Sequence, residues 1–111
     1  MSWLNELESV PSVRRAVLAG MDGLVIESIG RGGLPAQVLA AELASLMRAM
    51  EGITGALDEE LRRFTLATSS YEVLAVCFQG YCLGALIERG ADRAAVGQKL
   101  TDLAMRLIDQ L

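Results

Sequence analysis

The segment from Pro35 to Leu57 most constrains the fold, because it reads as a helix with apolar residues on more sides than one small domain can cover. On a helical wheel its largest apolar residues form one stripe, which predicts the face that packs on the core. This stripe comprises Leu39, Leu43, Leu46, Met50, Ile53 and Leu57. The rest of the helix surface is too apolar to be left in water, so further cover is expected.

Smaller apolar residues flank the stripe on both sides. One flank holds Ala36, Ala40, Ala44 and Met47, and the other holds Val38, Ala49 and Ala56. Two interpretations remain open: a central helix wrapped by its own domain, or a helix that packs on its own sheet and on its copy across a two-fold axis. We favour the homodimer, with the Ala36 flank at the seam. Membrane insertion is disfavoured, because Glu42, Arg48 and Glu51 interrupt the apolar run.

Length and charge bound the class of protein. A chain of 111 residues predicts a single domain, 1–111, that can bury a core. Hydrophobic residues make up 52% of the chain, a surplus that suits an oligomer. A net charge of −4 argues against nucleic acid as a partner. The first residues lack the basic and apolar stretches of a secretory signal, so we expect a cytoplasmic protein with reduced cysteines.

Two hairpins are predicted, one before and one after the central helix in the sequence. Residues 13–20 and 24–29 read as strands joined at Asp22-Gly23, a dipeptide that readily adopts positive φ. The runs Val73–Phe78 and Cys82–Ile87 read as inner strands joined at Gln79-Gly80. A two-residue loop there would place Cys77 opposite Cys82.

The remaining elements complete an α+β order of helix, two strands, long helix, three strands and helix. Arg62–Ser69 alternates apolar and polar residues, as a half-exposed strand does. Asp92 can cap a last helix with one apolar stripe, formed by Val96, Leu100, Leu103, Leu107 and Leu111. The long helix should end before Asp58, because acidic residues at a helix C-terminus oppose its dipole.

The sequence offers no constellation that would carry catalysis. The chain contains no histidine, which removes the commonest general base and metal ligand. Cys77 and Cys82 are best explained by core packing, and a disulfide directly across the strands would be geometrically poor. The run Gly30-Arg31-Gly32-Gly33 lacks the spacing and lysine of a phosphate-binding loop. We therefore expect a protein that is not an enzyme and that has no metal or cofactor.

Three short motifs carry a resemblance to a known family. They are Asp22-Gly23-Leu24-Val25-Ile26 within residues 13–28, Ala41-Glu42-Leu43-Ala44 in the long helix, and Ala95-Val96-Gly97 at the start of the last helix. In this order and spacing they resemble the roadblock (dynein light-chain roadblock) family, over almost the whole chain. Glu27 departs from the pattern, since small residues are common at this place in the signature.

The resemblance implies a five-stranded antiparallel sheet with the long central helix on one face and the two terminal helices on the other. It also implies a homodimer in which the long helices lie antiparallel and the strand Arg62–Ser69 pairs with its copy. Together with the wheel, this predicts a dimer interface made of Ala36, Ala40, Ala44, Met47, Glu51, Arg62, Phe64, Leu66 and Thr68.

The same resemblance implies a function. Family members are noncatalytic platforms, many of which bind Ras-like small GTPases, and bacterial MglB-like members regulate the nucleotide state of a partner GTPase. The first expectation is thus a homodimer that binds and regulates a Ras-like small GTPase. A structural adaptor without effect on nucleotide hydrolysis is the second. A small-molecule sensor ranks last, because the inner strands offer few polar groups for a cavity.

Overall fold

A computed structural model describes residues 3–30 and 33–111. Arg31 and Gly32 of the glycine-rich connection lie outside the described residues. The elements along the chain are α1 (Asn5–Glu8), β1 (Val13–Gly20), β2 (Val25–Gly30), α2 (Ala36–Ala49), α3 (Glu51–Leu57), β3 (Arg63–Ala67), β4 (Tyr71–Phe78), β5 (Tyr81–Glu88) and α4 (Arg93–Leu107).

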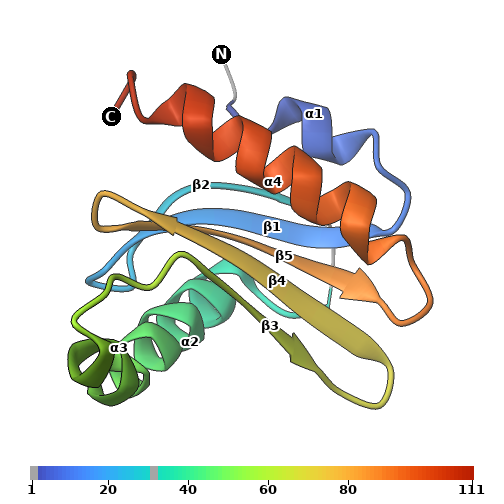
Figure 1. The fold of residues 1–111 in the computed structure, drawn as a ribbon. Coiled ribbons are helices and arrows are strands. Elements are labelled where there is room, and N and C mark those ends of the chain that lie inside the picture. Colours follow the sequence, from blue (N-terminus) through green and yellow to red (C-terminus); the bar gives the residue numbers. More distant parts are fainter. Residues whose placement is uncertain (1–2, 31–32) are drawn as a thin grey trace.

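The strands form one antiparallel sheet in the order β2-β1-β5-β4-β3. Helices α1 and α4 cover one face of this sheet, and α2 covers the other, with α3 continuing from the end of α2 (Figure 1). This arrangement confirms the predicted α+β fold. The outer strands β2 and β3 each pair with one neighbour among the described residues, so each leaves an edge unpaired.

The hairpin turns form where the sequence places residues that tolerate positive φ. Gln79 and Gly80 have φ values of 46° and 82°, as both central residues of a type I′ turn require. The turn sets the register, and Cys77 pairs with Cys82 as predicted. Gly23, with φ at 82°, serves the other hairpin, where its N–H donates to the carbonyl of Gly20 at 3.0 Å.

Large side chains fill the core between the sheet and the terminal helices. The fully buried ones on this side are Leu4, Leu7, Leu18, Leu83, Ile87, Val96, Leu100 and Leu107. Asp92 caps α4 as predicted, since its Oδ1 accepts from the Ala95 N–H at 3.1 Å. Leu111 departs from the predicted stripe and is 37% exposed, because α4 ends at Leu107.

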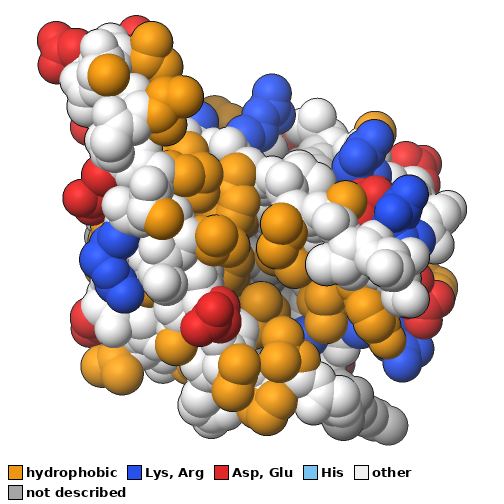
Figure 2. Space-filling model, turned by 90° about the horizontal axis from the view of Figure 1, so that it is seen from below, with side chains coloured by type: hydrophobic (Ala, Val, Ile, Leu, Met, Phe, Trp, Pro, Cys, Tyr) orange, Lys and Arg blue, Asp and Glu red, His pale blue; other side chains and the backbone are white. Residues whose placement is uncertain are grey.

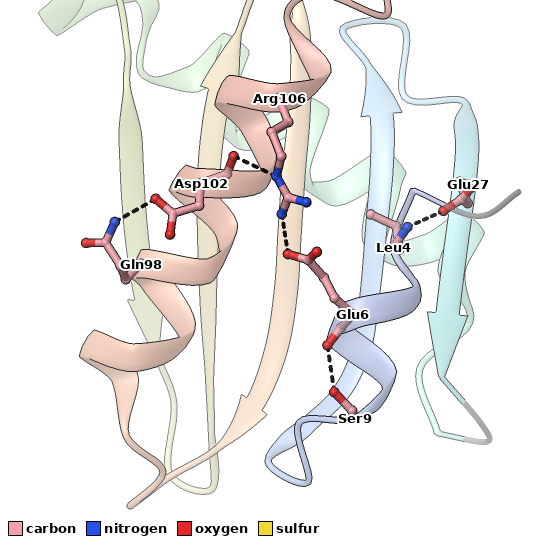
Figure 3. Close-up of polar contacts among 7 residues, drawn as sticks. All are labelled: Leu4, Glu6, Ser9, Glu27, Gln98, Asp102 and Arg106. Atoms are coloured by element: carbon pink, nitrogen blue, oxygen red, sulfur yellow. Dashed lines mark hydrogen bonds and ion pairs between the residues drawn. The ribbon is translucent and has the colours of Figure 1, made fainter.

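Polar contacts fasten α1 to its neighbours around this core (Figure 3). The Leu4 N–H donates to Glu27 Oε2 on β2 at 2.6 Å. Arg106 of α4 forms an ion pair with Glu6, and the Trp3 indole N–H donates to Gln110 at 2.8 Å. Glu27, the residue that departs from the family signature, thus holds the start of α1 against the sheet.

Candidate interaction surface

The core-facing side of α2 combines part of the predicted stripe, Leu39 and Leu43, with the flank of smaller residues that is assigned above to the dimer seam. The buried residues of this helix are Ala36, Leu39, Ala40, Leu43, Ala44 and Met47, which pack on the sheet of their own protomer. The expectation that Ala36, Ala40, Ala44 and Met47 form a seam with a second copy is therefore wrong. Their side chains are already enclosed.

Glycine at the centre of the sheet explains why the small flank of α2 faces inward. A Cβ atom at Gly84 would lie 2.5 Å from Leu43 Cδ1, so the helix sits close to β5 only because this position has no side chain. A second close approach joins α2 to the first hairpin, where a Cβ at Gly23 would lie 3.4 Å from Ala41 Cα. Short distances between helix and sheet favour alanines at the contact.

A break at Met50 explains why the predicted stripe does not stay on the core. The helix predicted from Pro35 to Leu57 is two helices, since α2 ends at Ala49 and α3 starts at Glu51. No residue of α3 is buried, and Ile53 and Leu57 are each 65% exposed. Asp58 then ends α3 in the left-handed conformation, with φ at 57°. The large apolar residues of α3 therefore face solvent in the protomer.

The outer side of α2 and α3 forms a surface that we call the open face. Its residues are Val38, Ala41, Ser45, Ala49, Ile53, Ala56 and Leu57, all of them exposed. Seen from this side, hydrophobic side chains gather in a band across the middle of the molecule (Figure 2). Exposed apolar surface of this kind makes the open face the candidate interaction surface.

The edge strand β3 borders this surface. Leu66 is 44% exposed, and Phe64 is half-buried against the core on the α2 side. Thr68 lies just beyond the strand and closes the turn into β4, where its N–H donates to the Tyr71 carbonyl at 2.8 Å. Arg62 is exposed, and its carbonyl accepts from the Cys77 N–H at 2.7 Å. These predicted interface residues all lie along or beside the β3 edge.

A pocket of about 640 Å³ opens at the end of the sheet beside α3. Glu51, the remaining residue of the predicted interface, lines it together with Met47, Cys77 and Tyr81. In the described part of the chain, this pocket included, no group of three or more cysteine or acidic side chains is placed to hold a metal ion. The described residues also include no buried polar or charged side chain. No described helix is long and apolar enough to cross a membrane.

Comparison with known proteins identifies the family. Residues 2–83 match the Roadblock/LC7 domain model, and the chain belongs to this family. Roadblock proteins are generally noncatalytic. No curated protein matches the sequence.

Solved structures share the whole fold. A Roadblock/LC7 domain from Streptomyces avermitilis is 26% identical, with a TM-score of 0.85, and the match covers 99% of this chain and 96% of that one. The gliding protein MglB from Thermus thermophilus is 17% identical, with a TM-score of 0.82 and coverage of 98% and 87%. A Schizosaccharomyces pombe profilin is 14% identical, with a TM-score of 0.68 and coverage of 97% and 98%. Because MglB and profilin both share it, the fold alone does not assign a function.

Proposed function

We propose that this protein is a noncatalytic homodimer that binds a Ras-like small GTPase and regulates its nucleotide state. One observation carries the dimer: the open face leaves Ile53 and Leu57 in solvent as part of an apolar surface. Membership of the roadblock family, whose bacterial MglB-like members regulate such GTPases, supports the choice of partner. The two parts of the proposal can be tested separately.

The residues of α2 match one another about a two-fold axis. When two copies of α2 lie antiparallel and cross at Ser45, Ala41 of one copy meets Ala49 of the other. The same axis brings Glu42 opposite Arg48, so opposite charges meet on both sides of the crossing. Small residues at the centre let the two helices approach closely. The surface is thus self-complementary in size and in charge.

The free edge of β3 extends this interface. Antiparallel pairing of two β3 strands would satisfy backbone groups that otherwise remain exposed and would bring the two Leu66 side chains near each other. We expect helix and strand contacts together to bury an interface of the size typical of stable complexes, roughly 1,600 Å² in total.

A charge on the open face tests the dimer. Ala49→Glu places a carboxylate at the seam beside Glu42, and we expect it to weaken self-association roughly a hundredfold. Ala94→Glu is the matched control, because Ala94 is exposed on α4, on the other side of the sheet. Sedimentation velocity across a concentration series measures both variants. A dimer that persists unchanged in Ala49→Glu would refute the proposed seam.

Charge reversal tests the position of the axis. Glu42→Arg should bring two arginines together and weaken the dimer, whereas Glu42→Arg combined with Arg48→Glu restores opposite charges and should recover much of the loss. If the double variant associates no better than the single one, the axis does not pass near Ser45.

Regulation of a GTPase requires no catalytic residue from this chain. A surface that binds one conformation of the switch regions better than another shifts their population, by no more than its difference in affinity. The decisive experiment measures nucleotide hydrolysis and exchange by a candidate Ras-like GTPase with and without the protein, with Ala49→Glu and Ala94→Glu as comparison. Altered turnover that depends on the dimer supports regulation.

A structural adaptor is the second candidate function. The sequence has no catalytic constellation, and the structure has an exposed apolar face. Both observations support an adaptor as well as they support a regulator. Binding of the GTPase with unchanged hydrolysis and exchange would favour the adaptor over the regulator.

A further inference from the structure

Cys77 and Cys82 lie directly opposite each other on β4 and β5, one residue pair from the turn. The Cys77 N–H donates to the Arg62 carbonyl at 2.7 Å, on the side away from β5. The two cysteines therefore form a non-hydrogen-bonded pair, in which Cα atoms are about 4.5 Å apart. This separation lies at the short end of the range that a disulfide spans, about 4.4–6.8 Å.

The two thiols differ in their access to solvent. Cys77 is partly exposed and lines the pocket of about 640 Å³ beside α3. Cys82 is fully buried behind it. A small reagent in the pocket thus reaches Cys77 and does not reach Cys82, so any reaction must begin at Cys77.

Local contacts favour the same order of events. A hydrogen bond from Cys82 lowers the pKa of the Cys77 thiol, although partial burial opposes this effect. The same bond and burial raise the pKa of Cys82. Cys77 is therefore the thiol that more readily forms a thiolate, the nucleophile in disulfide exchange. Its Sγ also lies 3.4 Å from the Sδ of Met47 on α2.

We propose that Cys77 and Cys82 form a reversible dithiol–disulfide site that reacts with small disulfides entering from the pocket. The Cys77 thiolate attacks one sulfur of the reagent, whose S–S bond breaks, and the first small thiol leaves with a proton from solvent. Cys82 then attacks Cys77 Sγ, the mixed disulfide breaks, and the Cys82 proton passes to the departing sulfur, so that the second small thiol leaves. The protein loses two protons and two electrons, and the reagent is reduced to two thiols.

The position in the sheet makes the product easy to reduce. A disulfide between directly opposed residues of a sheet is strained, and strained disulfides have higher reduction potentials. Such a bond suits a switch better than a permanent cross-link. Its formation draws Cys77 Sγ toward Cys82 and away from Met47, which lies three residues before the break between α2 and α3.

Oxidised glutathione is a suitable probe, because the chain has no other cysteine. The folded protein is incubated with it under native conditions, and intact mass and free thiols are measured. We expect an intramolecular disulfide, a mass lower by two hydrogens, loss of both free thiols and recovery after dithiothreitol. Retention of both thiols, or glutathione that stays attached to the wild-type protein, would overturn the proposal.

Single substitutions identify the role of each thiol. Cys82→Ser should stop at a mixed disulfide on Cys77, and Cys77→Ser should not react in the folded state. Because Cys82 is fully buried, Cys82→Ala provides a second variant without a buried hydroxyl, and circular dichroism shows whether each variant is folded. Reaction of the folded Cys77→Ser variant at the same rate as the wild type would contradict the assigned order.

Discussion

The two faces of the sheet are built from different kinds of side chain. Beneath α1 and α4, large residues such as Leu18, Leu83 and Leu100 are fully buried, and polar contacts fasten the helices at their ends. Beneath α2, alanines and Gly84 form a thin contact, and the chain then continues into α3, which buries nothing. The first face is thus filled by large buried side chains, while the second leaves the apolar residues Ile53 and Leu57 in solvent.

Truncating one leucine on each face should give the largest difference in the free energy of unfolding. Leu100→Ala removes a fully buried side chain and should lower the free energy of unfolding by about 2–5 kcal/mol. Leu57→Ala makes the same change at a position that is 65% exposed, and it should leave protomer stability nearly unchanged while weakening self-association. Chemical denaturation at low protein concentration measures the first effect. If both variants lost the same free energy of unfolding, the two faces would not differ in how much they stabilise the protomer.

A side chain at Gly84 tests the close contact of α2 with the sheet. Gly84→Val should push against Leu43 and lower the free energy of unfolding by about 1–3 kcal/mol. Combining it with Leu43→Ala makes room, so the double variant should be more stable than the sum of the two single losses predicts. Strictly additive losses in thermal or chemical unfolding would show that Leu43 and position 84 do not compete for space.

Removal of the cap on α4 should have an intermediate effect. Asp92→Ala leaves the Ala95 N–H without its acceptor and should lower the free energy of unfolding by about 1 kcal/mol. Asp109→Ala removes a similar charge at an exposed position beyond the end of α4 and serves as the control. The difference between the two variants in denaturant unfolding measures the stabilisation due to the cap. If the two variants do not differ, the cap does not stabilise the protein.

The smallest effect is expected in α3. A Cβ at Gly55 would meet nothing within 4 Å, and the residue is helical, so Gly55→Ala should raise the free energy of unfolding by about 0.4–1 kcal/mol. The gain should appear in the denaturation midpoint without a change in mass in solution. A loss of stability would mean that α3 packs against something that the protomer does not contain.

The sequence determines most of the fold through local signals. Gln79-Gly80 and Asp22-Gly23 meet the backbone demands of their turns, and Asp92 with one apolar stripe defines α4, so these elements are predictable from neighbouring residues. The register of Cys77 with Cys82 follows from the length of its turn.

The candidate surface was harder to predict, because α2 offers two apolar sides. The side that faces the sheet depends on Gly84, which lies more than thirty residues further along the chain. A helical wheel of residues 35–57 does not include this glycine. The signal that was available is Gly52 and Gly55, which weaken the helix just beyond Met50 and are consistent with a break there. The predicted strand residues Phe64 and Leu66 do lie beside the open face, and their role in a dimer stays a prediction.

Because α3 is short, its helical structure depends on any ligand that binds to it. Seven residues are too few to stay helical in water by intrinsic propensity, and α3 has no buried side chain to hold it. A ligand that covers Ile53 and Leu57 must therefore supply the free energy that keeps α3 helical. Its measured affinity is lowered by that amount. Amide protection in α3 should consequently report occupancy more sensitively than any change in the sheet.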